Sequence, residues 1–279
     1  MVGLDGSDSA QLALGWAVRE ASTRDAQLEV ITVTSQRQLV GSVEGASWPT
    51  AGELELAAQQ LQDRALSQYV LDDVEVVRAH EYGHPAGVLV EASRSADLLV
   101  VGSRGLGQVS GLVLGSVSHQ VVAHASCVVV VVPDNAPAVE RIVVGVDGSP
   151  PSLRALRWAW DEARLHDAHL EAVSVYRATA PILVGAPLVP QASGPSSSQL
   201  HESARRDLDD ALELAVPKPE DVERTVLEGP ASARLLDRAH DADLLVVGSR
   251  GLGGFKGLLL GSVSQRCVTH APHPVAIVR

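Results

Sequence analysis

Two glycine-rich segments of the sequence have the residue types and spacing of phosphate-binding loops. Both follow the pattern Gly-x2-Gly-x9-Gly-Ser, the first from Gly102 to Ser116 and the second from Gly248 to Ser262. Glycine lets the main chain approach a ligand closely, and successive N–H groups can surround an anion. We therefore expect alanine at Gly102 or Gly248 to weaken one site each, because its Cβ would lie where phosphate approaches. The alternative is a tight loop whose glycines serve only packing.

Side chains around these segments could add to anion binding. Each final serine opens a predicted helix, so free N–H groups and the positive end of the helix dipole face the glycine loop. Ser116 and Ser118 add hydroxyl donors, and Arg104 and Arg250 could pair with phosphate oxygens. Neither of the two lysines stands in a Gly-Lys-Ser/Thr sequence, so a Walker A loop is excluded.

Two aspartates close predicted strands beside the same loops. Asp5 and Asp147 each precede a glycine, which is typical of a carboxylate that initiates a turn. The functional interpretation is that either carboxylate accepts a hydrogen bond from the adenine or ribose of a nucleotide, or contacts a metal. On the next predicted strand, Val33 and Val175 could offer main-chain N–H and C=O groups to an adenine edge, or could simply pack within the sheet.

The loops belong to a sequence that repeats itself. Residues 96–118 and 242–264 differ at four positions, and VGLDGS at 2–7 matches VGVDGS at 144–149. A double match of this kind indicates two copies of one domain. The predicted organisation is a first domain at 1–133, a linker at 134–140 and a second domain at 141–279.

Composition limits the class of protein. With 46% hydrophobic and 20% charged residues, a chain of 279 residues can form two globular domains. Its net charge of −12, without a dense Lys/Arg cluster, argues against nucleic-acid partners. We find no signal peptide and no apolar run of the roughly 18 residues that a membrane helix needs, and we expect a cytoplasmic protein. We interpret Cys127 and Cys267 as buried packing residues rather than reactive thiols.

Hydrophobic periodicity predicts alternating strands and helices, most clearly in the second repeat. The predicted strands are 141–146, 170–176, 222–227, 243–247 and 275–278, and the predicted helices are 152–166, 202–215, 229–239 and 262–271. This order requires an α/β fold in which each repeat is a doubly wound parallel sheet with helices on both faces. The first repeat follows the same plan with a shortened first strand, because Met1 aligns with Val143.

With these motifs the chain resembles the ATP-binding subclass of the universal stress proteins. VGVDGS, followed far downstream by Gly-x2-Gly-x9-Gly-Ser, is the specific signal, and it covers nearly the whole chain twice. The resemblance implies a five-stranded parallel sheet of order 3-2-1-4-5 in each repeat and one ATP per repeat, bound with Mg²⁺. It also implies that the repeats pair through their last strands, Val128–Val132 and Val275–Val278.

The resemblance further implies which residues contact ATP. In the first repeat they are Gly3, Asp5, Val33, Gly102, Ser103, Arg104, Gly105, Leu106, Gly107, Gln108, Gly115, Ser116, Val117 and Ser118. In the second repeat they are Gly145, Asp147, Val175, Gly248, Ser249, Arg250, Gly251, Leu252, Gly253, Gly254, Gly261, Ser262, Val263 and Ser264.

One metal-binding motif is set aside. Residues 80–84 match the pattern HExxH. A zinc site of this type needs both histidines on one face of a continuous helix, whereas this match follows a strand-like run and is interrupted by Gly83 and Pro85. We therefore expect no metalloprotease and no metal ligands here, and His84 could instead lie near the nucleotide crevice.

Three functions remain open at this point. The first is an ATP-binding regulatory or stress-response module, in which ATP biases a surface that a protein partner or a second copy of the chain reads. No general base is evident near the phosphates, so we expect no enzyme beyond slow ATP hydrolysis. The second is a nucleotide hydrolase or transferase that uses the same sites. The third is a nucleotide-free scaffold that assembles through its last strands.

Overall fold

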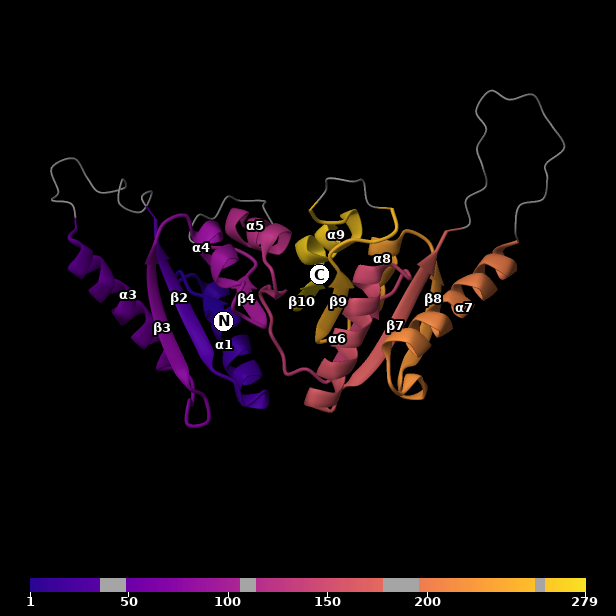
Figure 1. Ribbon diagram of the computed structural model, residues 1–279, viewed down its shortest axis with the longest axis horizontal. Helices are drawn as coiled ribbons and strands as arrows, with labels where there is room; N and C mark the ends of the chain where they lie inside the picture. The colour runs from indigo at the N-terminus through magenta and orange to yellow at the C-terminus, as the bar shows by residue number, and fades with distance from the viewer. Residues whose placement is uncertain (36–48, 106–113, 178–195, 254–258) are drawn as a thin grey trace, which may run out of the picture.

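The computed structural model describes the chain at residues 1–35, 49–105, 114–177, 196–253 and 259–279. In these residues, two α/β repeats join their strands in one ten-stranded sheet (Figure 1). The strand order is β3-β2-β1-β4-β5-β10-β9-β6-β7-β8. Each half has the predicted order 3-2-1-4-5 with parallel neighbours, so the predicted fold class is confirmed.

The first repeat contains five strands and four helices among the described residues. The strands are β1 (Val2–Gly3), β2 (Leu28–Thr34), β3 (Val76–Tyr82), β4 (Leu98–Gly102) and β5 (Val128–Val132). The helices are α1 (Asp8–Thr23), α3 (Ala51–Leu66), α4 (Pro85–Ala92) and α5 (Ser116–His124).

The second repeat has the same plan in its described part. Its strands are β6 (Arg141–Gly145), β7 (His169–Tyr176), β8 (Glu223–Glu228), β9 (Leu244–Gly248) and β10 (Val275–Val278). Its helices are α6 (Pro150–His166), α7 (Ser197–Ala215), α8 (Ala231–Arg238) and α9 (Ser262–His270), with a short 3-10 turn at Pro219–Asp221.

Local side-chain signals decide where several helices begin. The helix predicted from residue 202 starts earlier, at Ser197, because the Ser196 side chain accepts from the Gln199 N–H and Gln199 bonds back to the main chain of Ser196. This reciprocal capping box satisfies two N–H groups that a helix otherwise leaves free. The apolar spacing used for the prediction begins only after the first turn, so it missed this start.

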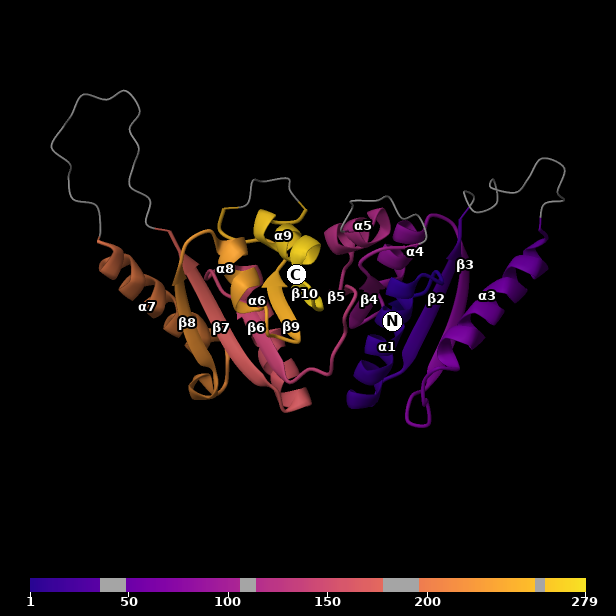
Figure 2. The same ribbon diagram turned by 180° about the vertical axis from the view of Figure 1, so that it is seen from behind.

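Apolar side chains cover both faces of the sheet. On one face, α1, α3, α6 and α7 pack in a buried layer that includes Trp16 and Leu208. On the other face, α4, α5, α8 and α9 pack in a second layer that includes Leu89 and Cys267. Both layers contain residues of both repeats, and α5 and α9 lie on either side of the middle of the molecule in both views (Figures 1 and 2). The two repeats therefore share their core.

The repeats meet along the antiparallel pair β5 and β10. Val130 lies opposite Ala276, with Val131 opposite Val275 on one side and Val129 opposite Ile277 on the other. The predicted pairing through the last strands is therefore confirmed. It covers the two strand edges that separate repeats would expose.

The first strand is short, as expected. β1 spans two residues whereas β6 spans five, but the Met1 carbonyl still accepts from the Val100 N–H at 2.9 Å. In the described part of the chain, no helix has the length and apolar character needed to cross a membrane.

The seam between the repeats provides a stability test. Val130 is fully buried at the centre of the pairing, so Val130→Asp should lower the free energy of unfolding by more than about 3 kcal/mol, because it buries an unpaired carboxylate. Val70→Asp is the control, because Val70 is 82% exposed and should change stability by less than about 0.5 kcal/mol. Urea unfolding measures both; equal effects would show that the seam does not hold the fold together.

Candidate nucleotide-binding crevices

Both glycine-rich segments begin where a central strand ends. β4 ends at Gly102 and β9 at Gly248, beside β1 and β6, which end at Gly3 and Gly145. The chain leaves β1 toward α1 on one face of the sheet and leaves β4 toward α5 on the other. In open α/β sheets, ligands bind in the crevice at such a switch point. The structure thus places both segments where a ligand site is expected.

Within the part of the chain that the structure describes, the second strand of each repeat extends beyond its neighbouring first strand at this crevice and has no strand partner on that side. The Leu4 N–H donates to the Ile31 carbonyl at 2.8 Å, so Ile31 faces β1, which ends at Gly3. Peptide groups two residues apart on a parallel strand face the same neighbour, so Val33 points its N–H and C=O past the end of β1.

The second repeat repeats this arrangement. The Val146 N–H donates to the Val173 carbonyl at 2.9 Å, and Val175 lies two residues further on, beyond Gly145 at the end of β6. Both valines are half-buried. In both repeats the valine therefore lies beside the end of the first strand, and the contact of its main chain with adenine stays a prediction.

Asp5 and Asp147 initiate turns. The Asp5 Oδ1 atom accepts from the Ser7 N–H at 3.0 Å and from the Ser7 hydroxyl at 2.6 Å, and Asp147 bonds Ser149 in the same way. The intervening glycine has a positive φ in both turns, +86° and +76°, which favours glycine. The turn interpretation of both aspartates is thus correct.

The aspartate carboxylates also support the glycine loops. Asp147 Oδ2 accepts from the Leu252 N–H at 3.0 Å. A Cβ on Gly105 would lie 2.6 Å from Asp5 Oδ2, and a Cβ on Gly251 would meet Asp147 Oδ2 even more closely. These two glycines are needed because the loop crosses directly over the carboxylate.

Gly102 and Gly248 have a packing role that differs from the predicted one. A Cβ on Gly102 would lie 2.7 Å from the carbonyl carbon of Ser9, and a Cβ on Gly248 would lie 2.7 Å from that of Pro151. Both contacts are with the main chain of the first turn of α1 or α6. An alanine at either position would therefore clash with a helix backbone, whether or not phosphate is bound. Both glycines thus have a packing role, and their role beside phosphate stays a prediction.

Ser9 was not singled out from the sequence, although it touches the loop. Its hydroxyl lies 3.5 Å from the Ser103 hydroxyl and accepts from the Arg104 N–H at 3.3 Å. Ser9 and Ser103 are both buried. A serine two residues after the helix cap carries no periodic signal, so only the fold reveals this contact.

Hydrogen bonds hold the two ends of each loop together. The Gly115 N–H donates to the Ser103 carbonyl at 2.7 Å, and the Gly261 N–H donates to the Ser249 carbonyl at 2.8 Å. The buried Ser118 hydroxyl donates to the Gly102 carbonyl at 2.6 Å. Ser264 makes the same bond to the Gly248 carbonyl, also at 2.6 Å. Both serine hydroxyls therefore stabilise the loop, which is a role that the sequence did not indicate.

Among the described residues, no side chain caps the start of helix α5 or α9. Their N-cap residues are Gly115 and Gly261, and neither provides a side-chain acceptor. By contrast, Ser7 and Ser149 cap α1 and α6 with their hydroxyls. The first turn of α5 includes the exposed Ser116 and the half-buried Val117, and the first turn of α9 includes the exposed Ser262 and the half-buried Val263. Their main-chain N–H groups lie at the helix starts. An uncapped helix start with such groups suits an anion.

The two arginines lie at the start of the loops. Arg104 forms an ion pair with Asp134 of the linker, whose side chain is 74% exposed. Such exposed pairs contribute little free energy, so phosphate could replace the aspartate. Arg250 is exposed. The positive charge of Arg250 also acts on Arg279 at the end of the described chain. Burial and, to a smaller extent, this charge lower the pKa of Arg279.

Four predicted site residues lie outside the described residues. They are Leu106, Gly107, Gln108 and Gly254. The predicted site residues that the structure does describe lie at the loop ends, the strand ends and the helix starts. In the first repeat they cluster where β1 and β4 end, and in the second repeat they cluster where β6 and β9 end.

The HExxH match is not a metal site. Residues 80–82 lie at the end of β3, Gly83 follows in an extended turn, and His84 is the N-cap of α4. His80 Nε2 lies 2.8 Å from the Thr34 hydroxyl. Among the described residues, no group of side chains close enough to share a metal ion includes His80 or His84. The match therefore lacks the continuous helix that a zinc site of this type needs.

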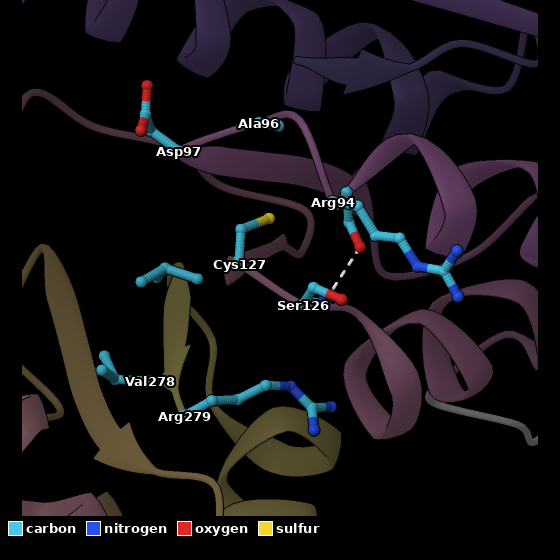
Figure 3. A pocket seen from close by; sticks show the side chains of 9 residues that line it. Arg94, Ala96, Asp97, Ser126, Cys127, Val278 and Arg279 are labelled. Atoms are coloured by element: carbon cyan, nitrogen blue, oxygen red, sulfur yellow. Dashed lines mark hydrogen bonds between the residues drawn. The ribbon is translucent and has the colours of Figure 1, made fainter.

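A cavity of about 310 Å³ lies at the junction of the repeats (Figure 3). Its lining comes from the ends of α4 and β10 and the start of β5, and includes Arg94, Cys127 and Arg279 but none of the predicted site residues. Burial raises the pKa of the half-buried Cys127 thiol, and it raises that of Cys267 to about 12. Both cysteines are thus poor thiolates, in agreement with the packing interpretation.

Comparison with known proteins identifies the family. The model of the universal stress protein family matches residues 1–133 and 138–279. The chain belongs to the universal stress protein family. A universal stress protein of Mycolicibacterium smegmatis is 33% identical over 299 residues, which cover 100% of this chain and 96% of that one. A universal stress protein of Mycobacterium tuberculosis strain H37Rv is 32% identical over 297 residues, which cover 100% and 95%.

A solved structure shows the same fold. The crystal structure of a universal stress protein from Archaeoglobus fulgidus has a TM-score of 0.69 to this chain at 19% sequence identity. The match covers 100% of this chain and 97% of that chain. The two proteins therefore share this fold over nearly their full length.

The glycine contacts of this universal stress protein predict a stability effect. Gly248→Ala should lower the free energy of unfolding by about 1–3 kcal/mol, because its Cβ would push against the Pro151 main chain. Gly253→Ala is the matched control, since no atom of the described residues other than its chain neighbours lies within 4 Å of its Cβ position, and it should change stability by less than about 0.5 kcal/mol. Thermal unfolding without nucleotide distinguishes them; a fully stable Gly248→Ala protein would contradict the packing role of this glycine.

Proposed function

We propose that each repeat of this universal stress protein binds one ATP and that ATP occupancy regulates the surface around the crevice. One observation carries the proposal. In each repeat, the unpaired main-chain edge of the second strand and the uncapped helix start lie at the same end of the sheet, on opposite sides of a strand that ends early.

The two ends of the crevice match the two ends of the nucleotide. Adenine presents a hydrogen-bond donor and an acceptor side by side, which complement the C=O and N–H groups of Val33 or Val175. The triphosphate suits the free N–H groups and the positive dipole end of α5 or α9. β2 and β4 are two strand spacings apart, about 10 Å, so the ribose would cross the end of β1. Mg²⁺ would be held mainly by the phosphate oxygens.

The geometry supports binding more than turnover. A hydrolase needs a group near the phosphates that accepts a proton from water. Asp147 follows the end of β6 by two residues, and both of its oxygens already accept hydrogen bonds, from Ser149 and Leu252. We therefore propose a regulatory module with slow hydrolysis at most.

The seam argues against assembly through the last strands. β5 pairs with β4 and β10, and β10 pairs with β9 and β5, so neither has an open edge for another chain. The edges that remain at the ends of the ten-stranded sheet are those of β3 and β8. A scaffold built through β5 and β10 is therefore disfavoured.

Nucleotide content tests the proposal directly. Purified protein saturated with ATP and Mg²⁺, desalted and then denatured, should release close to two adenine nucleotides per chain, identified by mass. Isothermal titration of stripped protein should give the same stoichiometry. No released nucleotide and no heat of binding would reject ATP as the ligand.

A charge at the helix start should remove one site at a time. Ser262→Glu places a carboxylate at the first position of α9, where it stabilises the helix dipole but repels phosphate. Stability should be unchanged or slightly higher, while the affinity of the second site for ATP falls by about tenfold or more, equivalent to about 1.4 kcal/mol. Ser116→Glu should do the same to the first site.

The control keeps the same charge on the same helix. Gln265 is exposed and lies three residues after Ser262 in α9. We expect Gln265→Glu to leave two ATP sites per chain. If Ser262→Glu and Gln265→Glu weaken ATP binding equally, general repulsion explains the effect and the helix start does not hold phosphate.

A further inference from the structure

Four charged or titratable side chains meet where the two repeats face each other. Glu20 and Arg24 come from the end of α1, and Glu162 and His166 come from the end of α6. Both helices reach the side of the molecule along which the linker runs (Figure 1). The Arg19 guanidinium on α1 also donates to the linker carbonyl of Ala136 at 2.6 Å. The cluster therefore lies at the junction and away from the strand ends that form the crevices.

The cluster follows the internal symmetry of the chain. Asp5 and Asp147 are 142 residues apart, and the same offset relates Glu20 to Glu162. It also relates Arg24 to His166. The two repeats thus contribute equivalent carboxylates, but one contributes a permanent cation and the other contributes a histidine.

Each cationic side chain contacts both carboxylates. Arg24 lies 2.6 Å from Glu20 Oε1 and forms an ion pair with Glu162 Oε1. His166 Nε2 lies 3.1 Å from Glu20 Oε2 and 3.7 Å from Glu162 Oε2. The side chains of Glu20, Glu162 and His166 are 4%, 2% and 12% exposed. The four groups form one network that crosses the junction.

The charge balance of the network depends on one proton. Two carboxylates and one guanidinium leave one uncompensated negative charge, and a protonated His166 brings the sum to zero. A buried charge without a partner is costly, so the neutral imidazole would leave the network unstable. Glu162 Oε2 is buried and makes no hydrogen bond in the described structure, so it depends on the nearby imidazole.

We propose that Glu20, Arg24, Glu162 and His166 form an interrepeat latch, which is complete only while His166 carries its proton. The histidine replaces, at the symmetric position, the arginine that makes the other half of the latch permanent. The ends of α1 and α6 are then fastened to each other at neutral pH and released from each other in alkaline solution.

The electrostatic surroundings of His166 give the direction of the effect. The nearby carboxylates of Glu162 and Glu20 raise the pKa of His166 to about 9 from its ordinary value of 6.5. A raised pKa means that the latch contributes its full stability below pH 6.5 and loses it as the pH rises toward 9. Of the facing groups, burial raises the pKa of the Glu162 carboxyl on α6, whereas on α1 the contacts with His166 and Arg24 outweigh burial and lower the pKa of Glu20. The two carboxylates outweigh burial in the opposite sense at Arg24 and raise its pKa, so it stays a cation.

Two variants at one position test the proposal. In buffers with EDTA, so that no metal ion replaces the proton, the folding equilibrium constant of the wild type should fall on the order of a hundredfold between pH 6.5 and 9.5. His166→Arg should remove most of this loss, because the second cation becomes permanent. His166→Gln should be destabilised already at pH 6.5 and should also lose the pH dependence. Urea unfolding at each pH measures the constants.

Further variants separate the latch from background titration. His124→Gln is the matched control, because His124 is exposed on α5 outside the latch, and it should retain the wild-type pH profile. Glu20→Gln removes one carboxylate, so a neutral imidazole then leaves the network balanced and the pH-dependent loss should shrink. This variant keeps the test valid even if arginine does not fit at position 166.

Hydrogen exchange locates the change. After correction for intrinsic rates, the last turns of α1 and α6 should exchange faster at pH 9.5 than at pH 6.5 in the wild type, and equally fast in His166→Arg. The proposal is overturned if the wild type and His166→Gln lose the same stability with pH, or if the additional exchange lies elsewhere in the chain.

Discussion

The antiparallel pairing of β5 with β10 is the interaction on which the architecture of this protein depends. It joins two five-stranded sheets into one and lets both apolar layers continue from one repeat to the other. A parallel strand with an unpaired edge would invite pairing with other chains, and the pairing inside the chain removes both edges. It also brings the ends of α1 and α6 together, which places charged residues of the two repeats within contact distance.

The glycine-rich segments show how packing and binding share the same residues. Gly102 and Gly248 give room to the first turn of α1 and α6, and Gly105 gives room to the Asp5 carboxylate. These contacts bring the start of the loop close to the start of the next helix, where Ser118 completes the connection. Packing contacts therefore hold the described ends of each loop at the crevice where the proposed phosphate site lies.

The junction of the repeats combines an apolar seam with a buried ionic network. Apolar pairing between β5 and β10 is insensitive to pH, whereas the network of Glu20, Arg24, Glu162 and His166 has a charge sum that one proton changes. Both repeats carry a glutamate at the equivalent position, but the first repeat adds Arg24 where the second adds His166. The difference makes an otherwise symmetric junction responsive to conditions without altering either crevice.

The sequence alone determined the features that depend on local pattern and on repetition. Internal matches revealed two copies, apolar periodicity predicted the strands and helices, and the resemblance to universal stress proteins implied the strand order and the pairing of Val128–Val132 with Val275–Val278. Asp5 and Asp147 could be recognised as turn residues, because the glycine that follows belongs to the same short motif.

The tertiary structure determined the features that depend on contacts between residues far apart in the chain. The contact of Gly102 with the Ser9 main chain spans more than ninety residues, and the ion pair of Arg24 with Glu162 spans 138. Periodicity reports which face of an element is apolar, but it does not report which side chain of another element lies opposite. The loop glycines, the serine hydroxyls and the four-residue latch therefore acquired their roles only when the sheet brought distant segments into contact.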